Sequence, residues 1–87
     1  IGCPRSYYSC QNAVIDGNLI ILKYLHEKGY PWDELTFQYA VERGYLEIVK
    51  YLHKNRCPWD QDSLKAGTSD GNLDVLKYLH EKGYPIG

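Results

Sequence analysis

A period of 27 residues runs through this chain. Residues 17–29 return almost unchanged as 71–83, and a third copy of the same pattern begins at Gly44. A constant spacing of this length indicates a stack of small units, each burying its apolar side against its neighbours. Such arrays build extended surfaces for partners more often than pockets for chemistry. The repeat therefore favours a binding protein over an enzyme.

Each unit opens with Cys or Tyr followed by Pro. Proline disfavours helix in the residue before it, so this pair separates one unit from the next. The units run about 3–29, 30–56 and 57–83, and residues 84–87 start a further unit that is cut short. We expect residues 1–87 to form a single repeat domain.

Apolar residues at helical spacing predict two helices in every unit. Glycine at 29 and at 83 suits the left-handed residue that ends many helices. Arg56 replaces this glycine in the middle unit, so we expect Asn55 to take the left-handed position there. No residues remain for a strand, which predicts an all-α solenoid of three stacked helix-turn-helix repeats. The first helices should span about 7–16, 34–43 and 61–70, and the second about 18–28, 45–55 and 72–82.

The three cysteines are not arranged as a disulfide framework. Cys3 and Cys57 hold the same place two units apart, which puts them roughly 20 Å from each other at ordinary helix spacing, well beyond the reach of a bridge. Cys10 falls on the core stripe of a helix. We expect three reduced thiols and a cytoplasmic protein. The net charge of −1 gives no basic patch for nucleic acid or a membrane surface.

No group of residues has the arrangement that catalysis or metal binding requires. His26, His53 and His80 recur one stacking step apart, about 10 Å, whereas zinc needs every ligand within about 2.3 Å. No cysteine or serine is paired with a base, and no glycine-rich phosphate loop is present. We expect no enzyme activity, no cofactor and no metal.

The middle unit carries a family resemblance. Residues 44–52 (Gly-Tyr-Leu-Glu-Ile-Val-Lys-Tyr-Leu) resemble the start of the second helix of an ankyrin repeat, and residues 40–44 the end of its first. The chain is most similar to short 27-residue ankyrin-type repeats with Cys/Tyr-Pro-Trp-Asp linkers, as in protists and large DNA viruses. It lacks the Thr-Pro-Leu-His motif and the length for β-hairpin fingers. The resemblance implies a protein–protein interaction scaffold that would use its helical surface instead.

Comparing the three units predicts which side chains bind a partner and which pack the units together. Residues that differ between units on the first helices are free of the stacking constraint, and we predict that they bind the partner, although drift at an unconstrained surface would give the same variation. Aromatic residues that recur with the period are expected to pack between units. The partner-binding candidates are Tyr8, Gln11, Asn12, Leu35, Gln38, Tyr39, Asp62 and Lys65. The repeat-packing residues are Trp32, Trp59, Tyr24, Tyr51 and Tyr78.

Two alternatives to a simple binding module remain open at this point. The end units are close copies of the middle one and lack the polar outer face of a capping repeat. The chain could therefore stack end to end into a filament, since contacts between unlike faces grow if they do not close. It could equally be an excerpt of a longer array whose other repeats cover these ends.

Overall fold

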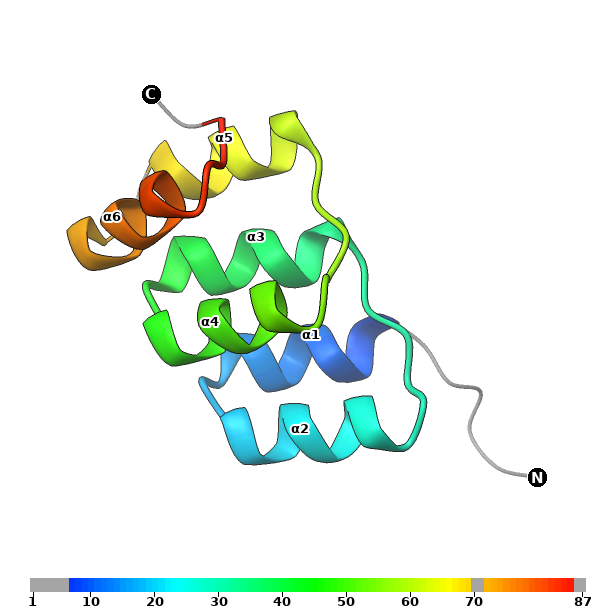
Figure 1. The fold of residues 1–87 in the computed structure, drawn as a ribbon. Coiled ribbons are helices and arrows are strands. Elements are labelled where there is room, and N and C mark those ends of the chain that lie inside the picture. The colour runs from blue at the N-terminus through cyan, green and yellow to red at the C-terminus, as the bar shows by residue number, and fades with distance from the viewer. Residues whose placement is uncertain (1–6, 70–71, 86–87) are drawn as a thin grey trace.

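Three helical hairpins stacked in sequence order make up the molecule (Figure 1). The structure, a computed structural model, describes residues 7–69 and 72–85. Within those ranges it contains six helices and no strand, which confirms the all-α solenoid. The first helices are α1 (Tyr7–Ile15), α3 (Glu34–Arg43) and α5 (Gln61–Ser69), and the second helices are α2 (Leu19–Glu27), α4 (Leu46–Lys54) and α6 (Leu73–Glu81).

The helices form two layers. The first helices α1, α3 and α5 pack directly on one another, whereas the second helices α2, α4 and α6 touch each other much less. The linkers between hairpins all run along the right-hand side in Figure 1, where α3 and α5 begin. One side of the solenoid therefore presents linkers and the starts of first helices.

The core lies between these layers and between successive units. Phe37 is the largest fully buried side chain, and the same helix position holds Cys10 in α1 and Leu64 in α5. On the second helices, Leu22, Leu52 and Leu79 are wholly buried. The apolar stripe read from the sequence thus becomes one continuous core. Its buried members are Cys10, Ala13, Val14, Leu22, Phe37, Ala40, Val41, Ile48, Val49, Leu52, Cys57, Leu64, Val75 and Leu79.

Side-chain caps fix where the first helices begin. The Asp33 carboxylate accepts a hydrogen bond from the backbone N–H of Thr36, and the Thr36 hydroxyl oxygen accepts one from the N–H of Asp33. This reciprocal pair satisfies two amides that the helix itself leaves free. Asp60 accepts from the N–H of Ser63 at 2.6 Å at the start of α5. Ser6, the corresponding residue of the first unit, lies outside the described residues.

The expectation that Asn55 turns left-handed is wrong. Asn55 has φ −96°, and Arg56 itself takes φ 57°. The N–H of Arg56 donates to the carbonyl of His53, and the N–H of Cys57 donates to that of Leu52. The same pair of hydrogen bonds follows α2 and α6 in the other two units. These bonds place the left-handed conformation at the same repeat position, which is Gly29, Arg56 or Gly83.

Small residues allow α3 and α5 to approach closely. A Cβ added to Gly67 would lie 3.1 Å from the carbonyl oxygen of Gln38 and 3.2 Å from Cβ of Val41. Ala13, Ala40 and Gly67 occupy one position of the repeat, and their small size predicts such an approach. The short distances at Gly67 confirm it for α3 and α5. The close approach brings successive first helices into one continuous surface.

Candidate functional site

Exposed side chains at one repeated position form a strip across the first helices. Tyr8 of α1 is 72% exposed and Leu35 of α3 is 39% exposed. Asp62 of α5 holds the same position and is exposed too, as are Asn12 and Lys65. We call Tyr8, Leu35 and Asp62, one from each unit, the first-helix strip. It combines two large apolar groups with a carboxylate.

Three of the predicted binding residues lie deeper than the sequence comparison indicates. The expectation that Gln11 is exposed is wrong, because it is 6% exposed and its amide donates to the Asp33 carboxylate at 3.1 Å. Gln11 thus secures the cap of the next unit's helix. Gln38 and Tyr39 are half-buried, and Gln38 donates to Glu42 at 3.4 Å within α3.

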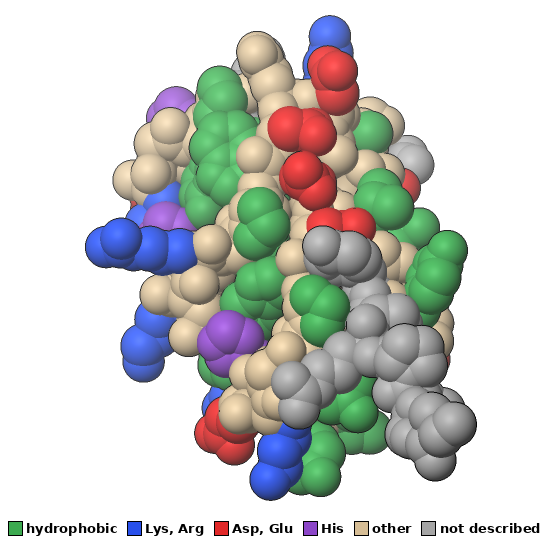
Figure 2. Space-filling view, turned by 90° about the vertical axis from the view of Figure 1, so that its right-hand side faces the viewer, with side chains coloured by type: hydrophobic (Ala, Val, Ile, Leu, Met, Phe, Trp, Pro, Cys, Tyr) green, Lys and Arg blue, Asp and Glu red, His purple; other side chains and the backbone are tan. Residues whose placement is uncertain are grey.

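Acidic residues lie at the starts of α3 and α5, beside the strip members Leu35 and Asp62. Glu34 and Asp62 lie in the first turns of α3 and α5, next to the capping residues Asp33 and Asp60. Carboxylates suit helix N-termini, where the helix dipole is positive. Figure 2 shows this side of the molecule, with a column of acidic side chains beside hydrophobic ones. The surface near the strip is therefore negatively charged and partly apolar.

A second set of contacts joins the second helices. The Tyr51 ring of α4 meets the His26 ring of α2 edge to face, with centroids 5.9 Å apart. The Lys23 ammonium of α2 lies 5.8 Å from the centre of the same ring. Lys23 and His26 are one turn apart, so both reach one tyrosine of the next unit. Cation–π and edge-to-face contacts of this kind are each stabilising.

The same contacts recur one unit later. His53 and Tyr78 are 5.8 Å apart and edge to face, and the Lys50 ammonium lies 5.9 Å from the centre of the Tyr78 ring. We call these two sets of contacts the Lys-His-Tyr ladder. Sequence analysis considered the three histidines only as possible metal ligands and did not predict the ladder. The signal was present, since all three residue types recur at the 27-residue period.

Tyr24 occupies the ladder position of the first unit but does not pack between units. The expectation that its ring turns inward is wrong, because Tyr24 is 56% exposed. The Lys28 ammonium of the same hairpin lies 5.4 Å from the centre of its ring. The physical reason is position in the stack: the described residues place no second helix before α2, so no Lys and His of a preceding unit reach this tyrosine.

The linker tryptophans pack in two different ways. Trp32 stacks face to face on His26, with centroids 4.1 Å apart, and meets the edge of Tyr51. Trp59, which is 37% exposed, instead contacts Tyr84 at 5.0 Å. Tyr84 follows α6 where the smaller Cys57 follows α4, and its ring takes up the space beside the tryptophan.

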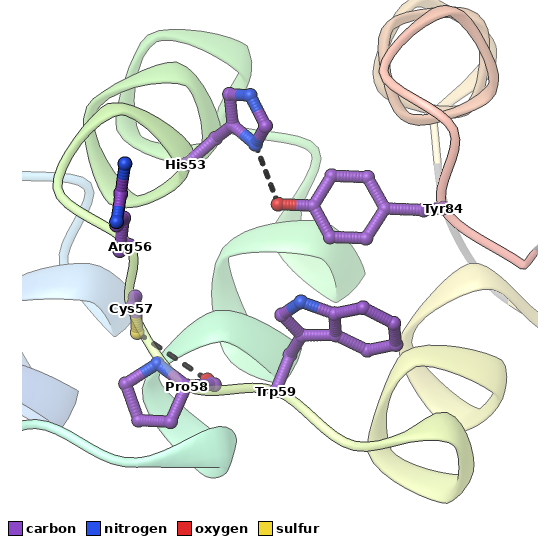
Figure 3. A pocket seen from close by; sticks show the side chains of 6 residues that line it. All are labelled: His53, Arg56, Cys57, Pro58, Trp59 and Tyr84. Atoms are coloured by element: carbon purple, nitrogen blue, oxygen red, sulfur yellow. Dashed lines mark hydrogen bonds between the residues drawn. The ribbon is translucent and has the colours of Figure 1, made fainter.

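A shallow cavity of about 380 Å³ lies at this second linker, lined by His53, Arg56, Cys57, Pro58, Trp59 and Tyr84. Figure 3 shows Tyr84 reaching from the segment after α6 toward His53. The Tyr84 hydroxyl and Nδ1 of His53 are 2.6 Å apart. The hydroxyl donates to Nδ1 when the neutral ring carries its proton on Nε2, and it accepts from Nδ1 in the other tautomer. This bond ties the segment after α6 to α4.

Buried thiols near the linkers are poor nucleophiles. Burial raises the pKa of the Cys57 thiol, as does the negative charge of Asp33. Burial and Asp33 also raise the pKa of Cys10. Both cysteines are free and buried, so at neutral pH they are protonated and serve as core residues. Cys3 lies outside the described residues.

The alkaline stability of the fold should depend on Tyr84. Burial, together with the charges of Tyr78 and Cys57, raises the pKa of Tyr84 to about 12, whereas tyrosine in an unfolded chain ionises near 10. The folded protein therefore keeps a proton that the unfolded chain loses. The free energy of unfolding should fall as pH rises from about 10 to about 12.

Denaturant titrations at pH 8 and pH 11 measure this effect. Tyr84→Phe should cost about 1 kcal/mol at pH 8 through the lost hydrogen bond, and should lose less stability than wild type between the two values. An equal loss in the two proteins would contradict the assignment.

The described residues offer no metal site and no membrane span. Nowhere in residues 7–69 and 72–85 do three His, Cys, Asp or Glu side chains come close enough to hold an ion. None of the described helices has the length and apolar character needed to cross a membrane.

Comparison with known proteins identifies the family. The fold defines a helical-repeat solenoid, and residues 10–53 match the family model described as ankyrin repeats (many copies). The match covers half of the chain, which therefore belongs to the ankyrin-repeat family. Searches among curated proteins and among solved structures found no match. Ankyrin repeats are generally protein-interaction modules of a non-catalytic, scaffold type. The more detailed assignment to the short variant of protists and large DNA viruses stays a prediction.

Proposed function

We propose that this chain, as a single repeat domain, binds a protein partner through the first-helix strip. One observation carries the proposal. Tyr8, Leu35 and Asp62 occupy one position of the repeat, all three are exposed, and each unit presents a different group there. The Lys, His and Tyr side chains of the ladder recur in every unit. The residue at the exposed strip position changes from unit to unit and is free to encode a partner.

The chemistry of the strip indicates the kind of partner. Tyr8 and Leu35 offer apolar contact area, and tyrosine in particular is enriched at interfaces. Glu34, Asp60 and Asp62 add negative charge at the same side. A protein segment with apolar side chains flanked by Lys or Arg complements this surface. The reduced thiols of Cys10 and Cys57 support a cytoplasmic location.

Differential capture tests the proposal. Proteins retained from an extract of the native source by wild type are compared with those retained by Tyr8→Ser/Leu35→Ser. The control is Lys54→Ser/Glu81→Ser, which changes two exposed residues near the ends of second helices. Circular dichroism verifies that all three proteins are folded.

We expect one set of partners to be lost with the strip variant, kept with the control, and weakened by added salt because charge contributes to the contact. A partner set unchanged in the strip variant, or lost in the control, would overturn the assignment of this surface.

A further inference from the structure

The two ends of the stack carry the two halves of one ladder contact. Tyr24, at the first end, is an exposed tyrosine without the Lys and His that Tyr51 and Tyr78 receive from the preceding unit. Lys77 and His80 of α6, at the last end, are exposed. They hold the positions of Lys23 and His26. Each end thus displays what the other end lacks.

Apolar residues at the first end show the same incompleteness. Ile21 is 47% exposed, whereas Ile48 and Val75 at the equivalent positions are 2% and 0% exposed. The equivalents are buried because each faces the unit before it. Ile20 beside Ile21 is also highly exposed. The first end therefore exposes at Ile21 an apolar position that Ile48 and Val75 bury inside the stack, whereas the equivalents of Ile20 are the exposed Glu47 and Asp74.

The last end of the stack exposes apolar residues of α6 that have no following unit to cover them within the described residues. Leu76 is half-buried, whereas Leu22 and Val49 at its position are completely buried. Leu73, one turn earlier in α6, is 65% exposed. Together with Lys77 and His80, these leucines repeat the surface that α2 presents to α4 and that α4 presents to α6.

We propose that the first end binds the last end of a second copy of this chain, so that Lys77 and His80 of one copy contact Tyr24 of the next. The argument is continuity with an existing interface: the same residue types already form this contact twice inside the molecule, with nearly equal distances. The two faces are unlike, so the contact is heterologous and can propagate into a chain of copies. It uses residues separate from the first-helix strip.

Sedimentation velocity and light scattering measure the association. Wild type should shift from the 10.1 kDa monomer to larger species between about 10 μM and about 1 mM, which corresponds to a weak contact of about 4–7 kcal/mol. Ile21→Lys/Tyr24→Lys disables the first end by placing positive charge against Lys77. Leu73→Ser/Lys77→Ala/His80→Ala disables the last end. Each variant alone should remain monomeric.

Mixing the two variants provides the decisive measurement. Each retains one intact end, so the mixture should form a one-to-one dimer and grow no further. Asn12→Lys/Gln61→Lys adds the same charge at exposed first-helix positions and should associate like wild type. A monomeric wild type over the whole range, a mixture that stays monomeric, or a first-end variant that still associates would each overturn the proposal. None of these outcomes bears on the first-helix strip.

Discussion

Phe37→Ala should lower the free energy of unfolding of this chain by about 3–5 kcal/mol. Phe37 is 1% exposed and is the largest fully buried side chain. It lies in the middle unit, so the cavity left by its ring would open onto both neighbouring hairpins. The ring also contacts Tyr84, with centroids 5.5 Å apart. Its removal therefore loosens the segment after α6 as well as the core.

The expected loss is a large part of the total free energy of unfolding. A chain of this size has a free energy of unfolding of about 4–13 kcal/mol, and each kcal/mol corresponds to roughly 4–8 °C in melting temperature. Thermal and urea unfolding followed by circular dichroism measure the change. Phe37→Leu is the matched control, because Leu64 fills the same position of α5. It should cost about 1 kcal/mol, since the side chain stays apolar and nearly fills the site.

A loss below about 1 kcal/mol for Phe37→Ala would contradict the packing described here, since cavities in well-packed cores carry a higher cost. A Phe37→Leu variant as unstable as Phe37→Ala would show that ring shape, rather than buried volume, holds the units together.

Sequence reasoning succeeds for this chain where the residue pattern alone determines structure. Apolar spacing within a unit fixes which side of a helix is buried, so Leu22, Leu52 and Leu79 could all be placed in the core. The cap at Asp33 is local too, because a carboxylate placed just before a helix accepts from an amide of the first turn. These are local properties, and every copy of the repeat has them.

Properties that depend on a neighbouring unit are harder to predict. Tyr24 and Tyr51 have nearly the same local sequence, yet of the two only Tyr51 has a preceding hairpin within the described residues to pack against. Gln11 is a polar residue outside the apolar stripe, which predicts exposure, but its amide donates to Asp33 of the next unit. Both cases depend on contacts between units, and these cannot be predicted from the pattern within a single unit.

Gly44→Ala should destabilise the protein more than the same change at the end of α6. Gly44 has φ 72°, a left-handed conformation that costs other residues about 1–2 kcal/mol. An added Cβ would also lie 2.8 Å from Cβ of Asn72 in the next unit. A Cβ atom cannot rotate away, so the hairpins must separate, which adds about 1–3 kcal/mol.

Gly83→Ala isolates the two contributions. Gly83 has φ 86° but nothing within 4 Å of an added Cβ, so only the conformational cost applies. At Gly17 the added atom would meet the end of the Tyr45 ring at 2.9 Å, and this side chain can swing away. Urea titrations of the three variants should rank the losses as Gly44→Ala greatest, then Gly17→Ala, then Gly83→Ala. Equal losses at Gly44 and Gly83 would contradict the close contact between Gly44 and Asn72, because an added Cβ meets a neighbour at Gly44 and none at Gly83.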